Sequence, residues 1–82
     1  MIRLDLPHGL EPALEECRRR GLVIRSEREL AGRPQSRHLH LRFPDRPGTI
    51  EFSEAGGRAW VQVHPHRDGG WAWKLAEELA RD

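Results

Sequence analysis

Hydrophobic and polar residues alternate with two different periods along this chain of 82 residues. In residues 2–6 every second residue is apolar, which is the pattern of a half-buried strand, and Pro7 ends it. The next apolar residues recur at helical spacing: they are Leu10, Ala13, Leu14 and Cys17. Glutamates lie near the start of this stripe and arginines near its end, followed by Gly21. The pattern predicts a helix over residues 10–20.

The remaining sequence predicts four strands and a second helix. Strand-like segments cover residues 22–29, 37–43, 49–53 and 58–64, with a loop at 30–36 and turns at 44–48 and 54–57. Asp68 is suited to cap a final helix. The apolar stripe of that helix consists of Trp71, Ala72, Leu75, Ala76 and Leu79.

The predicted fold class is α+β. We expect a two-layer α/β sandwich with the order strand, helix, four-stranded antiparallel meander, helix, in which both helices lie on one face of the sheet. The position of strand 2–6 stays open. It could lie parallel to strand 22–29, with the first helix as the crossover, or at another edge.

Composition narrows the class of protein. Residues 1–82 are expected to form a single domain, because a chain this short supports only one small core. Cys17 is the only cysteine, which excludes an intramolecular disulfide. Charges and Pro7 interrupt the N-terminal segment, so we expect no signal peptide and no membrane partner. A cytoplasmic protein is the resulting expectation.

Charge is unevenly distributed. The net charge is +1, but residues 18–46 contain nine arginines against three acidic residues. Such a basic block is able to contact a phosphate backbone, although two glutamates alternate with its arginines. The candidate nucleic-acid-binding residues are Arg25, Arg28, Arg33, Arg37 and Arg58.

The inward apolar residues suggest a register for the hairpins. We expect Leu41 opposite Phe52, and Phe52 opposite Ala59, since a slip of one residue would turn each apolar set toward water. One row across the outer face is then expected to contain Arg42, Glu51 and Trp60.

Trp60 is the unusual residue of this outer face. It has three competing roles: a structural stack on Arg42 or Arg58, a protein or self contact, or a platform for a nucleic-acid base. The predicted interaction face is Arg42, Glu51, Trp60 and Gln62. We therefore expect a non-catalytic protein-interaction module or a homodimer, and the alternative is a nucleic-acid-binding protein or small RNase that uses the basic central segment.

Four of the five histidines form two His-x-His pairs. In the expected register, His38 and His40 lie at one end of the sheet and His64 and His66 at the other. The separation is about eight residues, or ~26 Å at ~3.3 Å per residue. Zinc–ligand bonds are only about 2 Å long, so no four-histidine site and no cofactor are expected. Solvent exposure is the favoured interpretation, and His64 with His66 is the weak metal candidate.

The expected helix, three strands and final helix resemble the topology of small HicA-type RNase toxins, which carry one histidine after a Gly-Ser pair. The segment QSRHLH lacks that glycine and contains an extra residue, and an extra strand precedes the last helix. The resemblance concerns topology alone, and no family is assigned from it. It implies His38 or His40 as the weak candidate for a general base.

Overall fold

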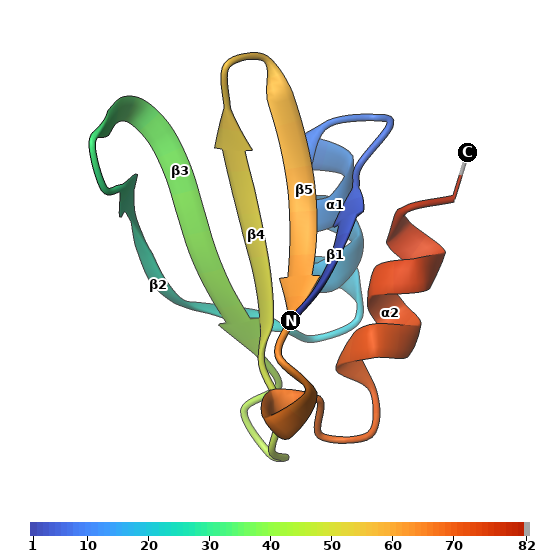
Figure 1. The fold of residues 1–82 in the computed structure, drawn as a ribbon. Coiled ribbons are helices and arrows are strands. Elements are labelled where there is room, and N and C mark those ends of the chain that lie inside the picture. Colours follow the sequence, from blue (N-terminus) through green and yellow to red (C-terminus); the bar gives the residue numbers. More distant parts are fainter. Residues whose placement is uncertain (82) are drawn as a thin grey trace.

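A computed structural model describes residues 1–81 and shows an α+β fold with one sheet and two helices (Figure 1). The elements are β1 Ile2–Asp5, α1 Leu10–Arg19, β2 Val23–Leu30, β3 Arg33–Arg42, β4 Ile50–Ala55, β5 Arg58–Val63, the short 3₁₀ helix η1 Pro65–Arg67, and α2 Ala72–Leu79. This order confirms the predicted succession of strands and helices. No helix among the described residues is long and apolar enough to cross a membrane.

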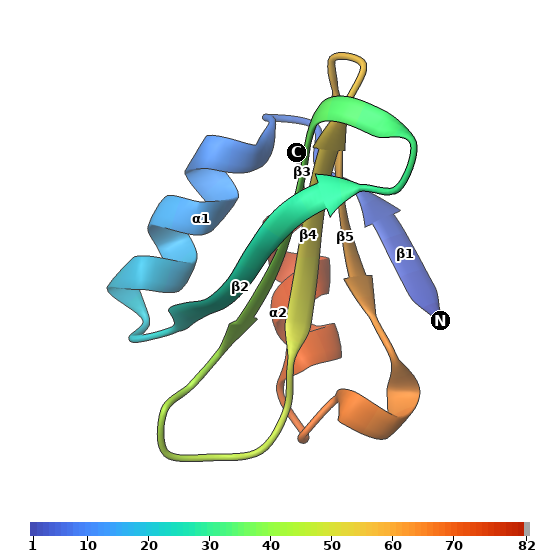
Figure 2. The same ribbon diagram turned by 90° about the vertical axis from the view of Figure 1, so that its left-hand side faces the viewer.

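The sheet contains five antiparallel strands in the order β1-β5-β4-β3-β2. Strands β2 to β5 are neighbours in chain order, whereas β1 lies beside β5, at the edge opposite β2 (Figures 1 and 2). Strand β1, whose position the sequence left open, thus lies at the edge of the sheet far from β2. This position puts Arg3 of β1 opposite Gln62 of β5.

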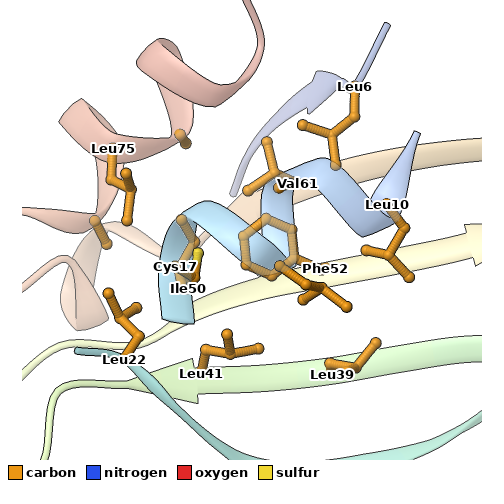
Figure 3. Packing of buried hydrophobic residues seen from close by; sticks show 14 of the residues in the cluster. Leu6, Leu10, Cys17, Leu22, Leu39, Leu41, Ile50, Phe52, Val61 and Leu75 are labelled. Atoms are coloured by element: carbon orange, nitrogen blue, oxygen red, sulfur yellow. The ribbon is translucent and has the colours of Figure 1, made fainter. Parts of the chain in front are cut away.

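A single hydrophobic cluster joins the sheet to the helices (Figure 3). Phe52, Ile50 and Leu39 of the strands are fully buried in it. The helices contribute the buried residues Leu10, Ala13, Leu14, Cys17, Ala72, Leu75 and Ala76. Each large apolar side chain removed from water contributes about 1.5–3 kcal/mol, so this cluster is the main source of stability.

The hairpin between β4 and β5 has a shorter turn than expected. Gly56 and Gly57 form the whole turn, with φ of 59° and 77°. Positive φ at both central residues is characteristic of a type I′ turn. The ladder continues up to this turn, so Phe52 lies opposite Val61 rather than Ala59. The predicted register of this hairpin is wrong by two residues.

The hairpin between β3 and β4 is shifted by the same amount. Leu41 lies opposite Ile50 rather than Phe52. Phe43 lies outside the strand in this register and packs edge-on against Trp71, with ring centroids 4.8 Å apart. Because both shifts are even, the inward residues stay inward, but every residue of the outer face acquires different neighbours.

The predicted loop at residues 30–36 is largely absent. Strand β2 runs to Leu30 and pairs with Arg33 at the start of β3, leaving only two residues for the turn. The register of β2 shifts between Ile24 and Ser26 and again between Arg28 and Leu30. Such bulges bend a strand and redirect its side chains, and β2 is strongly curved in Figure 1.

Candidate metal centre

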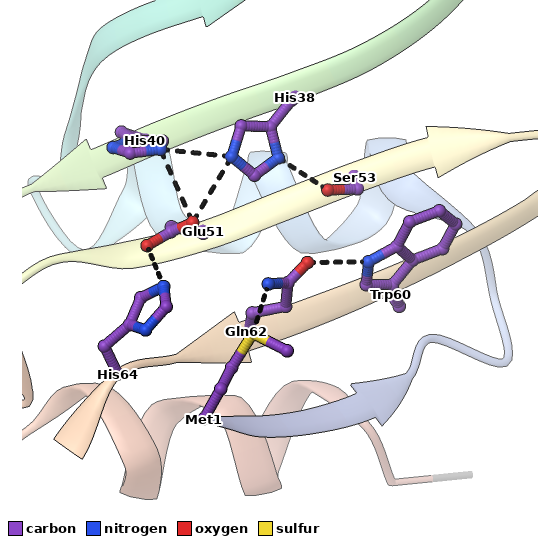
Figure 4. A network of polar contacts seen from close by, with 8 residues as sticks. All are labelled: Met1, His38, His40, Glu51, Ser53, Trp60, Gln62 and His64. Carbon is purple, nitrogen blue, oxygen red and sulfur yellow. Dashed lines mark hydrogen bonds and ion pairs between the residues drawn. The ribbon is translucent and has the colours of Figure 1, made fainter. Parts of the chain in front are cut away.

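Two neighbouring rows of side chains cross the outer face of the sheet. The first row is His40, Glu51 and Gln62, and the second is His38, Ser53 and Trp60. His38 and His40 are two residues apart on β3, so both side chains project from the same face. The register therefore brings both histidines to Glu51 in the middle strand (Figure 4).

Three ligand-type atoms converge at this point. Nε2 of His38 lies 3.1 Å from Nε2 of His40 and 3.3 Å from Oε1 of Glu51. Nε2 of His40 lies 3.4 Å from the same carboxylate oxygen. The three atoms form a nearly equilateral triangle, with the two imidazole rings almost perpendicular at 79°.

Glu51 is the only charged residue buried in the described part of the chain, with 4% of its surface exposed. A buried carboxylate is costly unless it is paired or hydrogen-bonded. Its Oε1 faces His38 and His40, and its Oε2 lies 3.1 Å from Nε2 of His64, just beyond the end of β5. Three imidazoles therefore surround one carboxylate.

Ser53 orients the ring of His38. Its side chain is completely buried, and its Oγ lies 2.7 Å from Nδ1 of His38. When Nδ1 donates its hydrogen to that oxygen, Nε2 carries the lone pair and faces Glu51. Metal-binding histidines usually have such a partner on the other ring nitrogen.

The environment of His40 favours its neutral form. Burial lowers the pKa of His40, and Glu51 opposes this effect. Electrostatic interactions with His38, Arg67 and Arg28 lower the pKa further. A neutral imidazole is the form that binds a metal ion.

The predicted separation of the two histidine pairs is therefore wrong for His38, His40 and His64, which all contact Glu51. Each hairpin is shifted by two residues, and together the shifts bring His64 to the carboxylate that His38 and His40 also contact. The rings of the weak metal pair, His64 and His66, stay close, with centroids 5.7 Å apart. Only His64 contacts Glu51, whereas His66 lies in η1 and lines a pocket.

Trp60 is buried rather than open to a partner, with 5% of its surface exposed. Arg3 covers its ring, with the guanidinium carbon 4.2 Å from the centroid, in place of the two arginines expected from the sequence. The indole Nε1 donates a hydrogen bond to Gln62 at 2.8 Å, and Gln62 contacts the sulfur of Met1. Met1, Gln62 and Trp60 lie on the β1 side of the site (Figure 4).

The row expected for the interaction face does not form. Glu51 faces His40 and Trp60 faces Ser53. Arg42 lies opposite Val23 at the end of β3. Two of the four predicted residues are thus buried within the chain itself.

On the opposite side of the site, a pocket of about 530 Å³ opens beside His40. Its lining includes Arg25, Arg28, His40, Thr49, His66 and Arg67. The pocket combines the curved strand β2 with the loop before β4 and with η1. Two predicted nucleic-acid-binding residues therefore lie next to the histidine cluster.

The other three predicted nucleic-acid-binding residues lie elsewhere. Arg37 donates to Glu27 and Glu11 at 2.9 and 2.8 Å. Arg58 lies 3.5 Å from a carboxylate of β1. Arg33 lines a separate pocket near the turn between β4 and β5. The five arginines do not form one continuous basic surface.

Glu51 is the ligand-type residue that the sequence analysis missed as a partner of the histidines. The signal was present, since His-x-His on one strand was predicted to face the same side as Glu51 on the next. The Gly-Gly dipeptide indicated a two-residue turn, and this turn alone corrects the register of one hairpin.

A comparison with known protein families, with curated proteins and with solved structures finds no match to this chain. The chemistry of the site is therefore inferred from its geometry.

Proposed function

We propose that this domain binds one divalent transition-metal ion through His38, His40 and Glu51. The observation that supports it is the convergence of three ligand-type atoms 3.1–3.4 Å apart. They are two imidazole nitrogens and one oxygen of the almost completely buried Glu51 carboxylate. The proposal departs from the expectation of a protein without a cofactor, because that expectation rested on a register that kept the histidines apart.

Zn²⁺ fits the spacing best. Four ligands arranged tetrahedrally about 2.0–2.1 Å from a zinc ion lie about 3.3–3.4 Å from one another. An octahedral ion with the same bond lengths brings adjacent ligands to about 2.9 Å. The three edges of the triangle are 3.1, 3.3 and 3.4 Å, closer on average to the tetrahedral value. Two histidines and one glutamate leave a coordination position free, as in catalytic rather than structural zinc sites.

Around this triad, Ser53 and His64 are positioning residues. Ser53 contacts the remaining nitrogen of His38, and His64 contacts the remaining oxygen of Glu51. A lone pair that binds a metal is not available to a general base, so metal binding and the RNase role of His38 or His40 are competing interpretations.

The test is a zinc titration of untagged protein freed of metal with a chelator. We expect one equivalent to bind, and Co²⁺ in its place to show the strong visible absorption of four-coordinate cobalt. His40→Ala and Glu51→Gln should each weaken zinc binding by more than about 100-fold, because each removes a ligand. The control is His8→Ala, an exposed histidine outside the cluster.

If hydrogen bonds among His38, His40 and Glu51 were the only role of this cluster, zinc would not bind stoichiometrically. Equal zinc affinity in wild type, His40→Ala and Glu51→Gln would also refute the proposal. Circular dichroism of each variant separates loss of a ligand from loss of folding.

The interaction module with a protein partner or a second copy stays a prediction, as does the cytoplasmic location. Burial of Glu51 and Trp60 weakens support for the predicted face. The exposed large apolar residues of the strands are instead Val23 and Ile24, on the edge strand β2. Sedimentation of the wild type across a concentration series tests self-association directly.

A further inference from the structure

The pocket beside His40 is lined by three arginines that form no ion pair with a described acidic residue. Within the described residues, Arg25, Arg28 and Arg67 form no ion pair, whereas arginines elsewhere, such as Arg20 and Arg37, each contact two glutamates. The nearby acids are also engaged. Glu27 contacts Arg37, Glu29 accepts from a backbone N–H, and Asp68 accepts from the backbone of residues 70 and 73.

We propose that this pocket binds the phosphate group of a small phosphate monoester, held by Arg25, Arg28 and Arg67 next to the metal bound at His38, His40 and Glu51. The placement of the phosphate beside a metal rests on the function proposed above. The anion site itself depends only on the pocket.

A bulge in β2 directs two neighbouring residues toward the pocket. Arg25 falls between Ile24 and Ser26, where the register of β2 against β3 shifts. In a regular strand, consecutive side chains project from opposite faces. Here Arg25 and Ser26 both line the same pocket, and Arg28 joins them. The irregularity thus increases the positive charge on one side of the sheet.

The third arginine is held in place by contacts between two loops. The carbonyl of Arg67 accepts a hydrogen bond from the backbone N–H of Thr49 at 2.8 Å. The indole of Trp71 donates to the carbonyl of Pro47 at 2.7 Å, which fixes the same loops a second time. Gly69 approaches Pro47 so closely that a Cβ would clash with its carbonyl. Arg67 is therefore presented from a tightly docked segment.

His40 belongs to both the pocket and the metal triad. An anion in the pocket would lie beside the ion, and the free coordination position of an open zinc site is available to an oxygen ligand. Arg28 and Arg67 line the same pocket as His40, so their positive charges lie next to the metal triad. A dianionic group balances this charge.

Size and charge distribution favour a small ligand. A volume of about 530 Å³ lies within the range of small-molecule pockets, about 300–1,000 Å³. A long nucleic acid needs a basic surface that extends beyond one pocket. Arg37 and Arg58, which would extend it, lie against carboxylates. A guanidinium presents paired donors that suit the oxygens of a phosphate.

The experiment is isothermal titration of inorganic phosphate and a ribonucleoside monophosphate into protein carrying one equivalent of zinc, with acetate as the monoanionic comparison. We expect both phosphates to bind with one-to-one stoichiometry and acetate to bind at least tenfold more weakly. Arg28→Gln with Arg67→Gln should weaken phosphate binding by about tenfold or more and leave zinc stoichiometry unchanged, because it removes two charged donors. The matched control, Arg18→Gln with Arg19→Gln on α1, removes the same charge far from the site and should bind phosphate like wild type.

The possible failures are distinguishable. No phosphate binding to the zinc-loaded wild type, or equal binding by the pocket and control variants, would overturn this inference and leave the zinc site standing. Phosphate binding with no zinc binding would refute the metal proposal, and the anion pocket would remain supported. A short oligonucleotide is titrated in the same way, and its binding without binding of either small phosphate would overturn the inference in favour of a nucleic-acid polymer.

Discussion

Glu51 and Phe52 are consecutive residues of β4, both almost completely buried, yet their surroundings are opposite in kind. Phe52 lies in the hydrophobic cluster with side chains from the helices and strands. Glu51 lies among three histidines on the other face. Burial alone therefore does not identify a core position in this sheet.

The two residues also differ in what determines their environment. The inward position of Phe52 depends only on the alternation of the strand, because any apolar neighbour provides a similar surface. Glu51 depends on which residue lies opposite it. A shift of two residues leaves Phe52 buried but would place Arg42 opposite Glu51 in place of His40. A polar site of this kind forms only when the strands pair in the correct register. A core requires only that the apolar side chains point to the correct face of the sheet.

The largest effect is expected for Phe52→Ala. Removing a fully buried aromatic ring leaves a cavity, and the free energy of unfolding should fall by about 3–5 kcal/mol. Urea denaturation followed by circular dichroism measures it. The matched variant Glu51→Gln should cost clearly less in stability while abolishing tight zinc binding. A larger loss of stability for Glu51→Gln than for Phe52→Ala would contradict this division between the two faces.

His64→Ala tests the second layer of the metal site. His64 contacts Oε2 of Glu51 but lies outside the triangle of ligand atoms. Its loss should weaken zinc binding by about 10–100-fold, the usual range for a residue that orients a ligand. One equivalent should still bind. The neighbouring variant His66→Ala should leave zinc affinity within about twofold, and a reversed order would mean that the two histidines have been assigned the wrong roles.

The sequence predicted the helices and strands and which of their residues point toward the core, because both depend on local periodicity. The stripes of both helices and the alternation in β3, β4 and β5 required no knowledge of partners. The site required long-range information. Phe43 leaves β3 to pack on Trp71, which lies 28 positions later in the chain, and no local pattern indicates this.

The position of Trp60 shows the same limit. The sequence predicted the face of the sheet from which Trp60 projects. The residue that covers its ring is Arg3, and this contact exists only because β1 pairs with β5. The sequence left the position of β1 open, so the covering arginine could not be identified. The Gly-Gly turn is the exception, since its two-residue length was readable from the sequence itself.

Cys17 is a titratable residue buried in the hydrophobic cluster, on the side of the sheet opposite Glu51. Burial raises the pKa of the Cys17 thiol to about 12, from its ordinary value of 9.0. Between these two values the unfolded chain loses the proton and the folded chain keeps it, so stability should fall by about 1.4 kcal/mol per pH unit. The chain has no tyrosine and one lysine, which limits other titrations in this range. Denaturation of wild type and Cys17→Ala from pH 8.5 to 11 should show a steeper decline for the wild type, and parallel declines would contradict burial of the thiol.

The smallest effect is expected for Arg3→Ala, which uncovers the polar side of the sheet. A cation–π contact at a partly exposed site is worth about 0.5–1 kcal/mol, so the loss of stability should be of that order. The control is Arg58→Ala, which removes a neighbouring exposed arginine that does not cover the ring. Tryptophan emission should shift to longer wavelength only in Arg3→Ala, because water then reaches Trp60. If self-association also increased in this variant alone, the predicted interaction face would exist in the chain and be closed by a single side chain.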